Sequence, residues 1–257
     1  MIRVKRSILG AFTIAEMEVR KIRHNSTELW TRVVQPALWL LVFGEVLNKI
    51  KDLSPTGFSY LQFITPGVLA QSVLFVSIFY GITVVWERDV GLLTKLLSTP
   101  SPRLSIIVGK SLAASVRGLF QAIMIFFLAL IIGVNLRFDI LDISGVLIVI
   151  VLFAMCFSSL SMLLASFLKT RDKMMGIGQA LTMPLFFASN AIYPVSLMPP
   201  WLQFISLCNP LSYVVDAMRA MLLTGDYSNL LLDITVLLLS TILFTTLASI
   251  SIKRLVD

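Results

Sequence analysis

One stretch of the sequence comes close to a phosphate-binding loop. Gly109-Lys110-Ser111 matches the end of the loop in which backbone N–H groups cradle a nucleotide phosphate and a lysine reaches it. That loop also needs a glycine five residues before Gly109, where this chain has Leu104. No other glycine-rich phosphate cradle occurs in the sequence. We therefore expect no nucleotide site on this chain.

Residues that commonly bind metals or catalyse reactions are few and isolated. His24 has no partner at metal-ligand spacing, so we expect an ordinary side chain at the membrane interface. Cys156 lies inside an apolar run and Cys208 precedes Asn209-Pro210, and neither belongs to a metal or redox motif. We expect two small buried thiols, no metal site and no catalytic residue.

Acidic residues are also scarce in the long apolar stretches. A proton- or ion-driven transporter needs a series of them across the membrane, and here Glu45 is the deepest candidate. An ion-coupled transporter and a membrane-embedded hydrolase are therefore poorly supported. If energy drives this protein, its source lies on another chain.

The elements that must position these residues are membrane-spanning helices. Apolar residues make up 57% of the 257 positions and charged residues only 14%, whereas soluble domains carry about 25% charged residues. A spanning helix needs about 20 mostly apolar residues. We expect an all-α membrane protein with a single transmembrane domain over residues 1–257 and six spans, at 33–48, 61–85, 112–134, 143–168, 174–192 and 230–252.

Basic residues predict the orientation, because Lys and Arg gather on the cytoplasmic side of membrane proteins. With the N-terminus inside, 17 of the 21 Lys and Arg residues are cytoplasmic, and four are not: Lys49, Lys51, Arg137 and Arg219. We expect a multi-pass protein of the cell membrane with both termini in the cytoplasm. The formal charge of +7 follows from these segments, so lipid rather than nucleic acid is the expected partner.

The segment before the first span predicts an amphipathic helix over residues 7–31. Apolar residues recur at spacings of four and three on one face, namely Ile8, Phe12, Ala15, Val19 and Ile22. With basic residues beside it, this helix is expected to lie along the cytoplasmic membrane surface. The alternative is a solvated tail. No small-residue cleavage site occurs, so we expect no signal peptide.

A second cytoplasmic segment, residues 87–103, predicts a short helix with an apolar ridge. It opens with Glu87-Arg88-Asp89 and stops at Ser98-Thr99-Pro100-Ser101-Pro102. Between them, leucines recur at helical spacing, at Leu92, Leu93, Leu96 and Leu97. A ridge exposed on the cytoplasmic side suits docking into a groove of a soluble partner. Periodicity alone also allows the leucines to lie on the lipid surface.

The stretch between the fifth and sixth spans, residues 193–224, is apolar but broken. Its prolines, Pro194, Pro199, Pro200 and Pro210, exclude one straight span. We expect short re-entrant or interfacial helices at one membrane face, with a break at Asn209-Pro210. Asp216 and Arg219 stand three residues apart, so on a helix they share a face and can pair.

Two blocks of residues carry a resemblance to a known family. The first is Glu87-Arg88-Asp89, Gly91, Leu93, Leu96-Leu97, Thr99-Pro100, Arg103 and Gly109-Lys110. The second is Pro184, Tyr193-Pro194, Met198-Pro199, Asn209-Pro210, Tyr213, Asp216 and Arg219. Over nearly its whole length the chain resembles the ABC-2 family of ABC-transporter permeases, especially the daunorubicin-resistance-like, drug-export branch. It departs from the family at Thr94, where many members carry glutamate.

This resemblance implies a machine of several chains. Two permeases, the second expected to be a copy of this one, would form the pathway, and two separate ATPase subunits would bind ATP and Mg. The implied coupling helix docks on the ATPase through Glu87, Arg88, Gly91, Leu92, Leu93, Leu96, Leu97 and Pro100. The N-terminal helix would be a second contact. The re-entrant region would cap the pathway outside, with Tyr193, Asn209, Pro210, Tyr213, Asp216 and Arg219.

The pathway walls are expected on the apolar second and fifth spans. Candidates on the fifth are Met174, Met175, Met183, Phe186, Phe187 and Asn190, although such residues serve helix packing equally well. An apolar wall suits a hydrophobic or amphipathic cargo, so we expect multidrug efflux or lipid export. A polysaccharide or lipid-linked glycan exporter is the alternative, although its pathway should be richer in aromatic residues. A non-ABC channel or a structural membrane protein is the second alternative.

Overall fold

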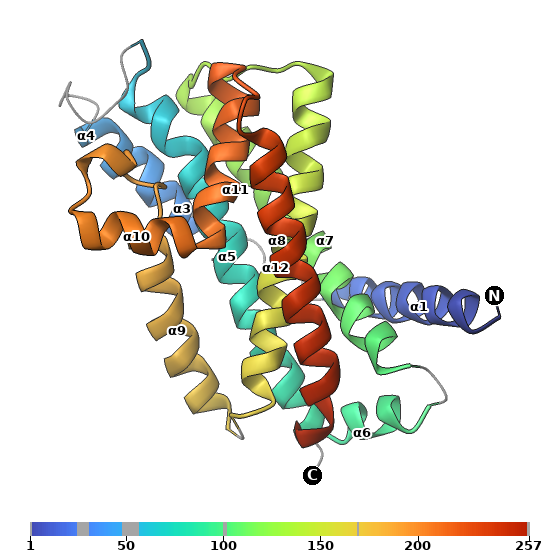
Figure 1. Cartoon of the computed structure of the whole chain (residues 1–257). Coiled ribbons are helices and arrows are strands. Elements are labelled where there is room, and N and C mark those ends of the chain that lie inside the picture. Colours follow the sequence, from blue (N-terminus) through green and yellow to red (C-terminus); the bar gives the residue numbers. More distant parts are fainter. Residues whose placement is uncertain (1, 25–30, 48–56, 100–101, 169, 256–257) are drawn as a thin grey trace.

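The computed structural model describes residues 2–24, 31–47, 57–99, 102–168 and 170–255, and every element described is a helix. Four of these helices are long and apolar enough to cross a membrane. They are α5 (Tyr60–Asp89), α7 (Arg103–Ile132), α8 (Ile140–Ala165) and α12 (Leu230–Ser251), which pack as a bundle (Figure 1). The expected all-α membrane fold is confirmed.

The two other predicted spans correspond to shorter elements. The first is an apolar helix over Val34–Leu47, built from α3 (Val34–Leu38), a π-helical segment (Trp39–Gly44) and α4 (Glu45–Leu47). The fifth is α9 (Arg171–Phe187), which ends five residues before the predicted boundary at 192. The six-span topology therefore stays a prediction.

The early end of α9 has a physical cause on α5. The chain after α9 turns back onto this helix, where the Tyr60 hydroxyl donates to the carbonyl of Ile192 at 3.1 Å. The backbone of Ala191 lies so close to Gly67 that a Cβ at Gly67 would come within 2.2 Å of the Ala191 oxygen. Residues 188–192 are thus held against α5 instead of extending α9.

α5 is the central helix of the bundle and packs against α7, α8, α9 and α11. Its contact with α8 is polar as well as apolar, since the Gly81 N–H donates to Ser161 Oγ at 2.9 Å and Ser161 Oγ donates to the Ile78 carbonyl. A Cβ at Gly81 would collide with Ser161 and Met174. Small residues and interhelical hydrogen bonds of this kind draw membrane helices together in the absence of a hydrophobic driving force.

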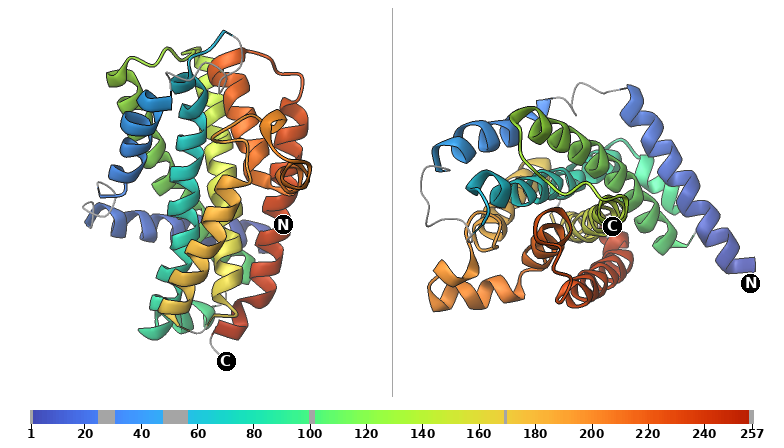
Figure 2. Two further views of the ribbon diagram at one scale, coloured as in Figure 1. Left: turned by 90° about the vertical axis from the view of Figure 1, so that its left-hand side faces the viewer. Right: turned by 90° about the horizontal axis from the view of Figure 1, so that it is seen from above.

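The N-terminal helix α1 (Ile2–His24) lies across the bundle, at a steep angle to the long helices (Figures 1 and 2). Of its predicted apolar face, Phe12 is 64% exposed and Ala15 and Val19 are half-buried, while the side chains of Ile8 and Ile22 lie outside the described part. A second face, formed by Ala11, Ile14 and Glu18, is buried, and α1 packs on α7. The sequence pattern thus identified the face turned away from the bundle and missed the face that holds the helix in place.

The broken stretch after α9 folds as predicted into short helices. These are a 3₁₀ turn (Val195–Leu197), α10 (Pro200–Cys208), α11 (Pro210–Arg219) and a π-helical turn (Ala220–Thr224). The break falls at Asn209-Pro210, where Asn209 Oδ1 caps α11 by accepting from the Leu211 N–H at 3.0 Å. Cys156 is buried as expected, but the expectation for Cys208 is wrong, because it ends α10 on the exposed side.

The two ends of the bundle differ in charge. The end that carries α6 (Leu92–Leu97), the connection between α8 and α9 and the C-terminal end of α12 also carries Arg88, Lys95, Arg171 and Lys253 (Figure 1). At the opposite end, the connections 133–139 and 225–229 carry a single basic residue, Arg137. By the positive-inside rule we expect the α6 end to lie in the cytoplasm, and this orientation stays a prediction.

This orientation predicts a labelling pattern. Single cysteines at Arg137→Cys and Asp226→Cys should react with a membrane-impermeant maleimide on intact cells, in a background carrying Cys208→Ser. Cysteines at Lys95→Cys and Lys253→Cys should react only after permeabilisation, because they lie at the other end of the bundle. External labelling of Lys95→Cys would reverse the orientation.

Candidate functional site

The predicted coupling segment is the first candidate site. Helix α6 follows Gly91, whose φ of 73° turns the chain sharply away from α5. Leu93 is fully buried in an apolar cluster of the bundle, which includes Ile14 of α1, Val84 of α5 and Ile107 of α7. Leu96 and Leu97 pack half-buried against the same cluster. The expectation that the leucines form an exposed ridge is therefore wrong for Leu93, because the bundle itself covers that face.

The surface that α6 leaves open is different and more polar. Val90 is 56% exposed just before the helix, and Thr94 and Lys95 are exposed on it. Leu92 is partly exposed, while Pro100 lies outside the described residues. A partner that docks at this end would therefore meet Val90, Thr94 and Lys95 before it meets the leucines.

The charged cluster before α6 splits into two sites. Asp89 pairs with Arg88 at 2.6 Å and, through its other oxygen, with Arg171 of α9 at 3.1 Å. The hydrogen bond from Arg88, supported by Arg171, holds the pKa of the Asp89 carboxyl below its usual value. Glu87 points the other way and is 1% exposed, so its expected role on the ATPase-docking surface is wrong.

Glu87 belongs to a buried group of three charges. Lys110 of α7 donates to Glu87 of α5 and, at 3.1 Å, to Glu18 of α1. The side chains of Lys110 and Glu18 are completely buried. One lysine thus joins three helices that are far apart in the sequence. We call Glu18, Lys110 and Glu87 the buried charge triad.

The backbones of α1 and α7 also approach each other closely beside the triad. Gly109 sits against α1, and a Cβ there would come within 2.6 Å of the Ala11 oxygen and 2.8 Å of Ile14 Cβ. Gly109 and Lys110, which match half of a phosphate loop in the sequence, therefore have structural roles. Gly109 allows α1 and α7 to cross closely, and Lys110 forms the ion pairs of the triad. Sequence reasoning missed Glu18 and started the third span at 112. A lysine about two turns inside an apolar helix, beside a glycine, was the available signal.

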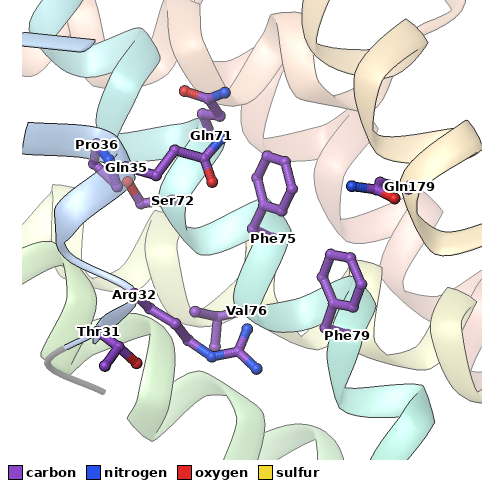
Figure 3. A pocket seen from close by; sticks show the side chains of 10 residues that line it. All are labelled: Thr31, Arg32, Gln35, Pro36, Gln71, Ser72, Phe75, Val76, Phe79 and Gln179. Atoms are coloured by element: carbon purple, nitrogen blue, oxygen red, sulfur yellow. The ribbon is translucent and has the colours of Figure 1, made fainter. Parts of the chain in front are cut away.

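The second candidate site is a cavity of about 390 Å³ between α3, α5 and α9 (Figure 3). Phe75 and Phe79 of α5 form one wall, with their rings nearly parallel and 5.9 Å apart. The amide side chains of Gln71 and Gln179 also line the cavity, and so does the guanidinium-bearing Arg32. The complete lining is Thr31, Arg32, Gln35, Pro36, Gln71, Ser72, Phe75, Val76, Phe79 and Gln179.

The six pathway residues predicted on the fifth span do not line this cavity. Met174, Phe186 and Asn190 are buried in packing, whereas Met175, Met183 and Phe187 are exposed. Phe187 lines a separate, mostly apolar groove of about 580 Å³ between α9 and α10, together with Tyr193, Trp201 and Asn209. α9 does contribute to the cavity, but through Gln179, which is not among the six predicted pathway residues.

The predicted pairing of Asp216 and Arg219 is confirmed. They lie 3.8 Å apart on α11, and Asn190 donates to the Asp216 carboxylate. Arg219 also donates to the Asn190 carbonyl at 2.6 Å and lies 3.7 Å from the Phe63 ring centre. Two tyrosines expected in this region are anchored as well, since Tyr213 donates to the Leu207 carbonyl at 2.7 Å and Tyr193 to that of Phe187. These contacts fix the broken stretch on α5 and on the end of α9.

Comparison with known proteins identifies relatives over most of the chain. A family model described as ABC-2 type transporter matches residues 11–223. The transport permease ycf38 of Cyanophora paradoxa is 30% identical over 222 residues, which cover 83% of this chain and 76% of the relative. The inner membrane transport permease YadH of Escherichia coli (strain K12) is 29% identical over 208 residues, 76% of this chain and 77% of the relative. The daunorubicin resistance ABC transporter permease protein DrrB1 of Streptomyces coeruleorubidus is less similar, at 24% over 200 residues, 78% of this chain and 70% of the relative.

The buried charge triad predicts a large and specific loss of stability. Lys110→Gln should lower the free energy of unfolding by about 3–5 kcal/mol, because it removes the ammonium group that pairs with both buried carboxylates. Denaturant titration of the purified protein in detergent measures this loss. The matched control is Arg20→Gln, which breaks an exposed pair with Glu16 on the same helix, at 2.7 Å, and should cost less than about 1 kcal/mol. Equal losses in the two variants would show that the triad has no special role.

Proposed function

The chain belongs to the ABC-2 type transporter family as a permease subunit, and from this premise we propose that it exports a hydrophobic or amphipathic cargo, a drug or a lipid, out of the cytoplasm. It is a membrane transport protein and not an enzyme. Permeases of this family pair with ABC ATPase subunits, and in our proposal ATP and Mg bind there. A second copy of the chain completes the pathway, and both termini lie in the cytoplasm. Family membership removes the non-ABC channel as an alternative.

The observation that carries the cargo proposal is the cavity between α3, α5 and α9. Its wall combines two phenylalanine rings with amide side chains, and the rings stand on α5, which is long and apolar enough to cross a membrane. A wall of this kind suits a molecule with an apolar body and a polar group. Drug export is also supported by the similarity to the daunorubicin resistance permease, which is 24% identical over 200 residues.

The docking surface that we propose for the ATPase is the open face around α6. It consists of Val90, Thr94 and Lys95, with the exposed side of Leu92. The buried Leu93 and Glu87 lie behind this surface, on the bundle side. Both residues connect α6 to the long helices. Their proposed role in coupling is therefore to transmit a movement of α6 to the bundle rather than to contact the ATPase.

This arrangement predicts which variants separate the permease from its ATPase. The double variant Val90→Glu/Lys95→Glu should lower co-purification of the ATPase at least tenfold, because it places two carboxylates on the proposed contact. Its thermal stability should stay at the wild-type value, since both side chains are exposed. Leu93→Asp should instead destabilise the permease itself, because it puts a charge into the apolar cluster.

The matched control is Ile140→Glu/Leu141→Glu, at the opposite end of the bundle, where both residues are about four-fifths exposed. This variant should retain the ATPase. If Val90→Glu/Lys95→Glu co-purifies with the ATPase at wild-type yield, the docking surface lies elsewhere.

A further inference from the structure

We propose that the cavity between α3, α5 and α9 binds the acidic head group of an anionic amphiphile, such as a phosphate ester or a free carboxylate with an apolar body. The proposal rests on the proposed transport function and narrows its cargo class. It also makes a binding claim that can fail independently of ATPase docking.

Gln71 is the residue that points to a ligand. It is 2% exposed, and neither its amide nitrogen nor its amide oxygen has a hydrogen-bond partner in the described part of the chain. Buried amides are normally paired, since an unpaired one loses the free energy of its hydrogen bonds to water. Gln71 lines the cavity, where Gln35 of the neighbouring segment reaches toward it (Figure 3). A ligand in the cavity that carries both donors and acceptors would satisfy it.

The charge of the cavity favours an anion. Arg32 is the only charged residue among the described residues that line it. Its guanidinium has five N–H donors in a planar fork, so it can bind a phosphate or carboxylate while keeping contacts elsewhere. A cationic head group would meet this positive charge and would find no carboxylate in the described lining. Electrostatic attraction is also stronger inside the bundle than in water.

The position of Arg32 is fixed by the bundle. Gln121 of α7 is fully buried and donates from its side-chain nitrogen to the Arg32 carbonyl at 3.1 Å. This bond holds the start of the α3 segment against α7, so that the Arg32 side chain extends along Val76 into the cavity (Figure 3). A cation held by the scaffold in this way is suited to selecting a head group.

The other wall of the cavity is apolar and would contact the apolar body of the ligand. The rings of Phe75 and Phe79 stack with an angle of 8° between their planes, and Val76 and Pro36 add apolar surface. A free inorganic anion would leave this wall without contacts. The volume of about 390 Å³ lies within the range of about 300–1,000 Å³ for small-molecule sites. It suits a head group and the first part of an apolar body, with the remainder outside the cavity.

The test measures binding of fluorescent dioleoyl phosphatidylglycerol to the full-length permease in neutral nanodiscs. Unlabelled phosphatidylglycerol should compete, whereas phosphatidylcholine with the same chains and glycerol 3-phosphate alone should not. Arg32→Gln should weaken binding at least tenfold, because it removes a charge-assisted contact. Gln71→Glu should weaken it at least as much, because it adds a buried negative charge beside the head group. The matched control Arg137→Gln, at the opposite end of the bundle, should bind as the wild type does.

Three outcomes would overturn the proposal. If phosphatidylcholine competes as well as phosphatidylglycerol, the site does not distinguish head groups by their charge. If glycerol 3-phosphate competes as well, the site binds an anion and does not require an apolar body. If Arg32→Gln binds with wild-type affinity, the positive charge that binds the head group is not that of Arg32.

Gel filtration and thermal melting check that each variant is folded. Gln71→Asn serves as a second, charge-neutral variant, and it is expected to weaken binding less than Gln71→Glu. If the binding test contradicts the head-group site, co-purification of the ATPase with Arg32→Gln shows whether the proposed pairing of the permease with its ATPase still holds.

Discussion

The structure depends on one buried lysine. Lys110 is fully buried and is paired with Glu18 and Glu87, each from a different helix. Burying a charge costs several kcal/mol, so the two buried carboxylates and the lysine stabilise one another inside the bundle. This pairing fixes α1 across the bundle and ties it to the last turn of α5 and the first turns of α7. The close approach at Gly109 and the apolar cluster around Leu93 then complete a junction of four helices at the proposed cytoplasmic end.

Much of the fold was accessible from the sequence because it depends on local signals. The long apolar helices, the break at Asn209-Pro210 and the pair of Asp216 with Arg219 all follow from composition and spacing along one segment. What the sequence could not supply were contacts between distant segments. Glu18 and Lys110 are 92 residues apart, and nothing in either segment alone identifies the other.

The same limit explains the errors at the candidate site. Periodicity shows that Leu93 lies on the apolar face of a helix, but it cannot show whether the bundle or a partner covers that face. The sequence shows that Glu87 carries a charge, but it does not show that a lysine from another helix lies beside it. The pathway residues stay a prediction, and they do not line the cavity between α3, α5 and α9. Apolar side chains such as Met174 and Phe186 look alike in packing and in a pathway, whereas an amide without a partner, such as Gln71, becomes visible only when its surroundings are known.

α5 connects the two candidate sites. Glu87 of the triad and Gln71 of the cavity stand on this single helix, sixteen residues or about 24 Å apart. The helix is buried against its neighbours over most of its length, and close-packed interiors do not deform gradually. In the transport cycle that we propose, a displacement of α6 would reach α5 through Gly91 and Leu93, and α1 and α7 would share it through the triad. The wall that carries Phe75, Phe79 and Gln71 would then move with α5 against α3 and α9. Motion at the proposed docking surface would thereby change the shape of the cavity and its affinity for cargo, without any side chain linking the two sites directly.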